Sequence, residues 1–345
     1  MRTFILATVV LAVATTLSAR AQQPPAPPPC TTTGDVQFVC GQQAPEDLVV
    51  VPGGQWVVAG AYAGTGGIYL IRVSDRMSLR AYPSAAAADN FDAKAYKGCP
   101  GPPTDAAKAK YQTHGLSLRD GRNGVHTLYA VHHGSRESIE VFTLDARPQT
   151  PTLTWIGCVV APDPIGLNSV RWLDDGGFIA TNFLPRGNPN GMAALQKGEK
   201  NGELWEWHAA TGWQKVPGSE SSGANGIEIS ADGRTLYVAG WGSQSFFRLS
   251  RGDKTPKREE VSLGFLVDNI HWAADGTLLA TGQGGFTQPP ETIIVKVDPK
   301  TLKITELLRR PGVNGFGGGT VAVEVGKSLW VGSYMGDRIA IFPAR

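Results

Sequence analysis

A short phrase recurs along this chain, and its first residue is nearly always one that could bind a metal ion or carry a proton. In each copy an apolar strand, a turn and a second apolar strand follow that residue. The six leading residues are Glu46, His114, Asn168, Asn225, Asp268 and Gly319. The residues directly after them are Asp47, Gly115, Ser169, Gly226, Asn269 and Thr320. The six copies therefore indicate a repeated fold, and their leading residues indicate a functional site.

The oxygen donors among these residues indicate a hard cation. Carboxylate and amide oxygens without a thiolate suit calcium, which accepts about six to eight oxygens in a flexible shell. Five residues would bind the ion with two negative charges, and water or substrate would fill the remaining positions: Glu46, Asn168, Asn225, Asp268 and Asn269. Zinc would prefer histidines, and His114 is the one histidine in the leading column.

Each of these residues, taken singly, also has an ordinary structural interpretation. An Asn before Gly, as at Asn225, is commonly a turn residue, while positions 46–47 could be a solvated loop and 268–269 a turn cap. Their recurrence at one position of the repeat favours the metal site. A buried carboxylate or amide needs a partner, and one bound cation would satisfy all of them together.

Histidines are the candidate proton carriers, because histidine titrates near neutral pH and is the usual general base. His114 leads the second copy, and His133 follows the next apolar strand and is expected beside it. We expect these two to be catalytic, the alternative being structural histidines bonded to backbone. His126, His208 and His271 lie within strands away from the leading position and are expected to be structural.

The spacing of the copies indicates what brings these residues together. The copies start 43 to 68 residues apart, which suits four-stranded propeller blades with variable loops. Gly-containing turn signals, such as 175–177 and 232–233, split the paired strands. Further strands are expected at residues 68–73, 139–144, 203–208, 245–249, 292–297 and 338–342. The sequence therefore predicts an all-β, six-bladed β-propeller with four-stranded blades; two packed sandwiches would not explain a sixfold phrase.

The first residues have the pattern of an export signal. Arg2 precedes an apolar run at residues 4–17, and 19–21 has the small-residue pattern of a cleavage site. The run is short for a bilayer span, although a membrane anchor is the alternative. We divide the chain into a signal peptide at 1–21, a Pro-rich leader and N-terminal segment at 22–40, and one propeller domain at 41–345. Ring closure is expected to use a strand from the N-terminal region, and the mature chain is expected to be periplasmic or secreted, without a membrane span.

The charge balance and the cysteine content indicate which partners the chain could bind and in which cellular compartment it would lie. Without Arg2 and Arg20 the chain has 30 basic and 30 acidic residues, so nucleic acid, whose binding depends on phosphate neutralisation, is not an expected partner. The four cysteines allow three disulfide connectivities, and an even count in an exported chain favours disulfides. We favour Cys30–Cys40 and Cys99–Cys158.

Two segments interrupt the repeat. Residues 84–112 and 184–201 are long insertions, each with a possible short helix, at 104–111 and 192–197. Such segments on a rigid ring either cover a functional site or are solvent-exposed loops. Four aromatic residues after blade strands could line a substrate pocket or pack internally: Phe183, Trp241, Phe286 and Tyr334.

The chain resembles the paraoxonase/arylesterase family of calcium lactonases, within the wider gluconolactonase and strictosidine-synthase-like group of six-bladed propellers. The matching pieces run from about Glu46 to Phe342 and are EDLVVVPGG, HGLSL, VHHGSRESIEVF, LNSV, ANGIEISADGRTLYVA, VDNI and GGGTVAV. Each piece is short, and their common order carries the resemblance. It implies a catalytic calcium ion on the same five oxygen-bearing residues and paired histidines at His114 and His133.

The resemblance also implies a second, structural calcium ion, and here the chain departs from the family. Asp47 and the Leu116 carbonyl match two of its ligands, but Ser169 stands where the family has a further aspartate. Gln283 stands where the family has a histidine after the last ligand pair. Since no cysteine follows Cys158, the family's disulfide between the N- and C-terminal parts cannot form.

The implied chemistry is metal-assisted hydrolysis of a small-molecule lactone or ester. Calcium would bind the carbonyl oxygen, and His114, supported by His133, would deprotonate the attacking water, with Asp268 or Glu46 as a competing base. Two alternatives remain. One is a gluconolactonase-type sugar-lactone hydrolase that uses Glu46, Asn168 and Asp268 on another divalent metal. The other is a non-catalytic ligand-binding propeller with a structural metal.

Overall fold

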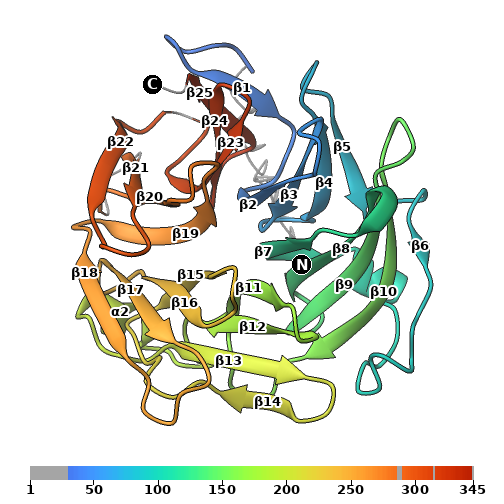
Figure 1. The fold of residues 1–345 in the computed structure, drawn as a ribbon. Helices are drawn as coiled ribbons and strands as arrows, with labels where there is room; N and C mark the ends of the chain where they lie inside the picture. The colour runs from blue at the N-terminus through green and yellow to red at the C-terminus, as the bar shows by residue number, and fades with distance from the viewer. Residues whose placement is uncertain (1–29, 286–289, 314, 344–345) are drawn as a thin grey trace, which may run out of the picture.

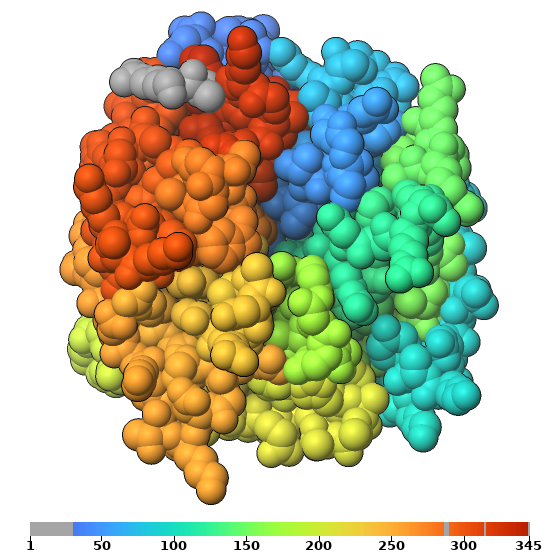
Figure 2. Space-filling model, viewed as in Figure 1, coloured from blue at the N-terminus to red at the C-terminus, as the bar shows by residue number. Residues whose placement is uncertain are grey.

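The computed structural model describes residues 30–285, 290–313 and 315–343, and these form a ring of six sheets (Figure 1). The chain is an all-β, six-bladed propeller, as the repeat predicts. The proposed signal peptide and the leader up to residue 29 lie outside the described residues. In the space-filling view the blades follow one another around the face in chain order (Figure 2).

Each blade is a four-stranded antiparallel sheet whose first strand is innermost, apart from one short extra strand in blade 2. Blade 1 consists of β2 (Pro45–Val50), β3 (Trp56–Ala61), β4 (Gly67–Arg72) and β5 (Ser78–Tyr82). Blade 2 consists of β7 (Gln112–Arg119), β8 (Val125–His133), β9 (Ser138–Asp145) and β10 (Thr152–Val160). Blade 3 consists of β11 (Leu167–Leu173), β12 (Gly177–Asn182), β13 (Glu203–His208) and β14 (Gly212–Lys215).

The second half of the ring repeats this order. Blade 4 consists of β15 (Ala224–Ile229), β16 (Thr235–Gly240), β17 (Ser245–Ser250) and β18 (Arg258–Ser262). Blade 5 consists of β19 (Leu266–Trp272), β20 (Leu278–Gln283), β21 (Thr292–Val297) and β22 (Ile304–Arg310). Blade 6 consists of β23 (Gly319–Val325), β24 (Ser328–Ser333), β25 (Arg338–Pro343) and β1 (Gln37–Cys40).

The N-terminal strand closes the ring, as expected. β1 pairs antiparallel with β25, with Gln37 opposite Ile341, so the first and last described strands share blade 6. The favoured disulfides are both present: Cys30–Cys40 lies at the end of this closing strand, and Cys99–Cys158 joins the first insertion to β10. The propeller sheet thus includes residues 37–40 of the segment that we placed before the domain.

The turn signals of the repeat form the hairpins between the two inner strands of each blade. Gly176, Gly233 and Gly276 adopt positive φ angles of 86°, 72° and 81° at these turns, a backbone conformation that glycine takes without a Cβ clash. The second copy differs, because a short 3-10 turn at Arg122–Gly124 lengthens its hairpin.

The apolar core is divided among the interfaces between neighbouring blades. One buried cluster packs Leu48 and Ile71 of blade 1 against Val321 and Trp330 of blade 6, and similar clusters fill the other interfaces. The stabilisation that such burial provides is roughly proportional to the apolar area removed from water. The ring is therefore held by blade-to-blade packing, which fixes where each innermost strand meets the channel.

A local irregularity occurs at the head of every innermost strand among the described residues. The pairing register shifts between Pro45 and Asp47 in β2, and equivalent shifts occur near the start of β7, β11, β15, β19 and β23. A β-bulge re-aims side chains that would otherwise alternate between the two faces of the sheet. Consecutive residues such as Glu46 and Asp47 can therefore both contact polar groups in the channel.

The two insertions have different places. Within the first, α1 (Asp105–Lys108) is capped by Thr104, and β6 (Ala88–Asp89) pairs with β10 at the outer edge of blade 2 (Figure 1). Within the second, α2 (Gly191–Gln196) places the buried Leu195 beside the loop that precedes β15, where the Ser222 hydroxyl donates to its carbonyl. Both expected short helices are thus present.

No helix among the described residues is long and apolar enough to cross a membrane.

Candidate metal centre

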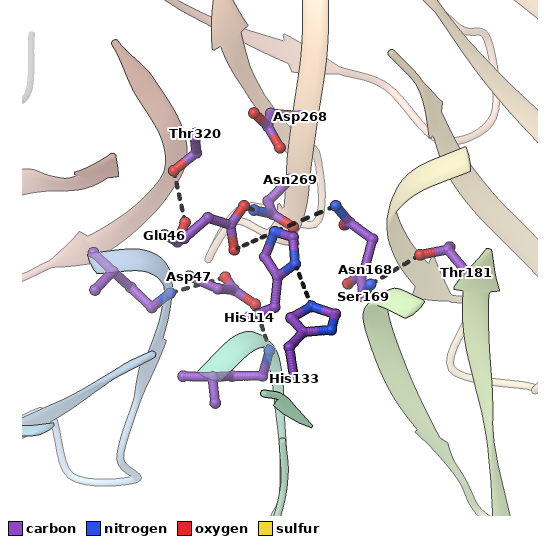
Figure 3. A network of polar contacts seen from close by, with 12 residues as sticks. Glu46, Asp47, His114, His133, Asn168, Ser169, Thr181, Asp268, Asn269 and Thr320 are labelled. Atoms are coloured by element: carbon purple, nitrogen blue, oxygen red, sulfur yellow. Dashed lines mark hydrogen bonds and ion pairs between the residues drawn. The ribbon is translucent and has the colours of Figure 1, made fainter. Parts of the chain in front are cut away.

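The predicted oxygen ligands lie at the starts of innermost strands from four blades, in the central channel. Figure 3 shows four of them: Glu46, Asn168, Asp268 and Asn269. All five are buried, with at most 5% of each residue exposed, and we call them the metal layer: Glu46, Asn168, Asn225, Asp268 and Asn269. Glu46 comes from β2, Asn168 from β11, Asn225 from β15 and the last two from β19.

Two small residues let the strands that carry these ligands approach one another. A Cβ atom on Gly115 would lie 2.6 Å from the Asn168 carbonyl oxygen, and one on Gly226 would lie 2.7 Å from the Asn269 Cα. Such contacts are shorter than van der Waals packing allows. The second column of the repeat is therefore small where neighbouring innermost strands touch, which brings the ligands of adjacent blades together.

Part of the metal layer is held by hydrogen bonds. The Asn269 amide donates to Glu46 Oε1 at 2.6 Å, and the Thr320 hydroxyl donates to the Glu46 carbonyl at 2.6 Å. The Gln283 amide donates both to Asp268 Oδ2 at 2.9 Å and to the Gly319 carbonyl at 2.7 Å. These donors orient the two carboxylates without supplying a positive charge.

Three oxygens of the metal layer have no hydrogen-bond partner within the described part of the chain. They are Glu46 Oε2, Asn168 Oδ1 and Asn225 Oδ1, all buried. An unsatisfied buried polar atom costs about 1–3 kcal/mol, and a charged one costs more. Three such atoms at one point of the fold indicate that the layer is built around something that accepts oxygen ligands.

The acidity of the two carboxyl groups leads to the same conclusion. Burial, together with the negative charges of Asp268 and Asp47, raises the pKa of Glu46 well above its usual value. Burial is also the main cause that raises the pKa of Asp268 to about 7. Two carboxyl groups shift in this way when they share a buried site without a cation. The oxygen donors, two negative charges and unpartnered oxygens fit a hard divalent cation such as calcium.

His114 and His133 lie together at the edge of the metal layer (Figure 3). His114 Nδ1 is 3.0 Å from His133 Nε2, and His133 Nδ1 is 2.8 Å from Glu137 Oε2. Glu137 Oε1 accepts a hydrogen bond from the Leu167 backbone amide, next to the ligand Asn168. Glu137, His133 and His114 therefore form a chain of three side chains, and His114 is the member nearest the metal layer.

The acceptor at the start of this chain determines the protonation of His133 Nδ1. Because the Glu137 carboxylate only accepts, His133 donates from Nδ1. In the tautomer in which His133 Nε2 accepts, His114 donates from Nδ1 and its Nε2 carries no proton; this Nε2 lies 3.4 Å from Asn168 Nδ2 and 3.6 Å from Glu46 Oε2. Burial and the nearby His133 hold the pKa of His114 well below its usual value. In this tautomer a free base faces the metal layer at neutral pH.

Aromatic side chains lie around this end of the channel. The Tyr62 ring lies 4.4 Å from the His114 ring, centroid to centroid, and remains 37% exposed. Trp241 contacts Phe183 edge-on, and its indole donates to Gln283. Burial is the main cause that raises the pKa of Tyr334, and the negative charge of Asp268 raises it further. Three of the four predicted aromatic residues thus lie near the site, and Phe286 lies outside the described residues.

A second set of charged side chains, two buried carboxylates with two partly buried partners, lies in the channel next to the metal layer. We call it the ion-pair layer: Asp47, Arg171, Glu228 and His271. His271 Nε2 lies 2.8 Å from Asp47 Oδ1, and His271 Nδ1 lies 3.3 Å from Glu228 Oε1. Arg171 Nε is 2.7 Å from Glu228 Oε2, an ion pair without the alignment of a hydrogen bond. Burial lowers the pKa of His271, but Asp47 and Glu228 outweigh burial and raise it to about 10.

The ion-pair layer separates the metal layer from a cavity of about 460 Å³ that Arg171, Glu228 and His271 help to line. The metal layer lies at the heads of the innermost strands, and this cavity is lined by residues further along them, such as Val50 and Leu118.

Another group of possible ligands lies away from the channel, on blade 3. Asp175, Glu206 and His208 place their ligand atoms within 4.8 Å of one another. Arg251 already occupies this group, since its guanidinium donates to Glu206 Oε1 at 2.6 Å and to Asp175 Oδ2 at 2.8 Å. A guanidinium ion between the carboxylates leaves them no need for a metal.

Sequence reasoning missed two residues of this region, and for a third it missed the partners. Glu137 lies four residues after His133, a weak signal, since charged residues are common at strand starts. Tyr62 follows β3 in a loop, and its contact with His114 arises between blades. His271 was expected to be structural, but its partner Asp47 is 224 residues away and gives no local signal.

The sequence matches no family model and no curated protein. The structure is similar to a luciferin-regenerating enzyme, with a TM-score of 0.56 and 14% identity, over 89% of this chain and 94% of that one. It is also similar to regucalcin, a calcium-binding protein from Agrobacterium tumefaciens, with a TM-score of 0.51 and 12% identity, over 89% and 93% of the two chains. Virginiamycin B lyase from Staphylococcus aureus gives a TM-score of 0.51 and 13% identity, over 89% and 98%. At this identity the likeness shows a shared propeller fold.

Proposed function

We propose that this chain is an exported, calcium-dependent hydrolase of lactones or of aryl or alkyl esters. One observation carries the proposal: His114, held by His133 and Glu137, has its Nε2 3.6 Å from Glu46 Oε2, beside buried oxygen ligands that lack hydrogen-bond partners among the described residues. A metal-binding propeller without catalysis would need the ring of oxygens but not the base beside it.

The metal layer would hold the ion, with Glu46 and Asp268 as charged ligands and the three asparagines as neutral ones. A bound calcium ion would polarise the substrate carbonyl and stabilise the oxyanion that forms on attack. The unpartnered oxygens Asn168 Oδ1, Asn225 Oδ1 and Glu46 Oε2 are the atoms available to it. The resemblance to calcium lactonases supports the same assignment.

The histidines would move the proton of the attacking water. His114 Nε2 would accept it, and His133 Nε2 would stabilise the resulting charge by holding the opposite N–H of His114. Glu137 would position His133 in the required tautomer. Glu46 and Asp268 are poorer candidates for the base, because metal binding would occupy their oxygens. Tyr62, Phe183 and Trp241 would provide an apolar wall for the acyl or aryl part of the substrate.

Export is part of the proposal. The N-terminal signal pattern and the two disulfides both support it, because disulfides persist in oxidising compartments. The periplasm and the cell exterior both meet this condition.

The central experiment is a hydrolysis assay of the purified chain on aryl esters, aliphatic lactones and sugar lactones, with calcium and with a chelator. We expect hydrolysis of at least one ester or lactone class that the chelator abolishes and calcium restores. Turnover that survives complete metal removal would refute the mechanism. Tight calcium binding without hydrolysis of any substrate would favour the non-catalytic binding propeller.

The base is tested by His114→Gln, which keeps a polar side chain at the site. We expect kcat to fall by about 10²–10⁴-fold, the usual contribution of general base catalysis, with calcium affinity retained. His208→Gln on the outer part of blade 3 is the matched control and should leave kcat unchanged. Full turnover in His114→Gln would transfer the role to a carboxylate.

A further inference from the structure

The ion-pair layer has the same number of carboxylates as the metal layer but a different set of partners. Asp47 and Glu228 supply two negative charges, and His271 and Arg171 lie against them. The two ring nitrogens of His271 face carboxylate oxygens, with Nε2 2.8 Å from Asp47 Oδ1 and Nδ1 3.3 Å from Glu228 Oε1. Both carboxylates of the ion-pair layer therefore contact His271, and Glu228 also contacts Arg171.

Asp47 has no oxygen left for a metal ion. Its Oδ1 accepts from the Leu48 amide at 2.8 Å and from His271 Nε2 at 2.8 Å. Its Oδ2 accepts from the Leu116 amide at 2.6 Å. The carboxylate is 0% exposed, so each of these donors would have to be displaced or moved for a cation to bind. Leu116 thus contacts Asp47 through its backbone amide.

The remaining position of a second metal site is also unsuitable. Ser169 stands where the resembled family has an aspartate, and its backbone amide donates to the Thr181 hydroxyl in a buried setting. A hydroxyl adds no negative charge. A divalent cation beside Asp47 would meet one carboxylate whose oxygens already accept three hydrogen bonds, a serine, and the His271 ring, which lies 2.8 Å from Asp47 Oδ1.

We propose that the His271 side chain, held between Asp47 and Glu228, takes the place of the second calcium ion that the resemblance implies, so that the channel binds one divalent cation. The inference rests on the metal site proposed above but not on hydrolysis. It gives the ion-pair layer a role: it supplies the partners of Asp47 and Glu228 from the protein's own side chains.

The first test is the number of calcium ions bound by the unmodified chain. Isothermal titration with calcium, checked by elemental analysis after dialysis, should give one ion per chain. Asp268→Asn should reduce this number to zero. Two ions on the unmodified chain would overturn the inference and leave the proposed function intact. No ion would overturn both, so the two failures are distinguishable.

The second test rebuilds the missing site. Ser169→Asp restores the family's carboxylate but keeps the His271 ring in place, and we expect it to bind one ion. The double variant Ser169→Asp/His271→Ala removes the ring as well, and we expect it to bind two. Thermal unfolding with and without calcium gives a readout independent of activity, and the double variant should gain the larger increase in Tm. A second ion in Ser169→Asp alone, or one ion in a folded double variant, would overturn the inference.

Discussion

The metal layer and the ion-pair layer each contain two buried carboxylates, but the partners of these carboxylates differ. Glu46 and Asp268 accept hydrogen bonds from the amides of Asn269 and Gln283, and three oxygens of the metal layer lack hydrogen-bond partners among the described residues. Asp47 and Glu228 are paired with His271 and Arg171. The comparison shows that burial of a carboxylate does not by itself indicate a metal site. The absence of an internal cation is the informative feature.

The two layers come from the same strands. Glu46 and Asp47 are consecutive in β2, Asn269 and His271 are two residues apart in β19, and Asn168 and Arg171 are three apart in β11. Register shifts at the strand heads allow this arrangement, because regular alternation would send consecutive side chains to opposite faces. A bulge of one residue therefore lets one strand serve both layers.

The largest expected effect tests whether the ion-pair layer stabilises the fold. Glu228→Gln would leave His271 and Arg171 with one carboxylate instead of two, and we expect a loss of about 3 kcal/mol in the free energy of unfolding. The loss should be the same with calcium and with chelator, as measured by urea unfolding. Glu259→Gln breaks an exposed pair with Arg248 and should change stability by less than about 1 kcal/mol. If the two substitutions lowered the free energy of unfolding equally, the prediction that the ion-pair layer stabilises the fold more than an exposed pair would be wrong.

The second prediction concerns competition between protons and calcium in the metal layer. The pKa of Asp268 is raised to about 7 in the metal-free fold, so this fold holds a proton that the unfolded chain has already released. Metal-free stability should therefore fall as pH rises through about 7, while the increase in Tm caused by calcium should grow. Calcium affinity should weaken by up to about tenfold per pH unit below 7. An affinity that is constant between pH 5.5 and 8 would contradict this account.

The third prediction separates the proton relay from the metal layer. Glu137→Gln keeps the size of the side chain but weakens its hold on His133, and we expect kcat to fall about tenfold, or about 1.4 kcal/mol. Calcium affinity should be unchanged. The ¹⁵N shifts of the His133 ring should show a change of tautomer population, which a purely structural role would not produce. A parallel loss of calcium binding would instead assign Glu137 to the support of Asn168.

The smallest expected effect is an increase in the free energy of unfolding, whereas Glu228→Gln is expected to decrease it. In the presence of chelator, Asp268→Asn should raise the free energy of unfolding by about 1 kcal/mol, because it removes one of two unpaired buried carboxyl groups. The same variant should lose the stabilisation by calcium. Urea unfolding in both conditions measures the two effects. Destabilisation of the variant in chelator would mean that the Asp268 charge is already compensated in the metal-free fold.

Much of the fold could be predicted from the chain alone. The sixfold phrase gave the number of blades, because each copy holds the two inner strands of one blade and carries its own turn residues. The strands expected at 203–208 and 292–297 coincide with β13 and β21. Ring closure by an N-terminal strand followed from the short C-terminal end of the last copy, and β1 fulfils it. Local propensity and repeat spacing are sufficient for these features.

The contacts within the channel could not be predicted in the same way. Nothing near His271 in the chain indicates Asp47 or Glu228 as its partners, and nothing near Glu137 indicates its contact with His133 and with the amide of Leu167. These contacts depend on bulges and on the packing of one blade against the next. Repeat spacing records neither of them.

The amino-acid sequence specifies which residues stand at the head of each blade, because strand and turn preferences act over a few residues and repeat with the phrase. It also specifies the oxygen chemistry of a site that would bind a hard cation. The arrangement in space specifies which charges are paired. Glu46 and Asp47 are adjacent carboxylates in the chain, and ring closure places one beside Asn269 and the other beside His271. Charge pairing depends on distance in space, and closing the ring creates those distances.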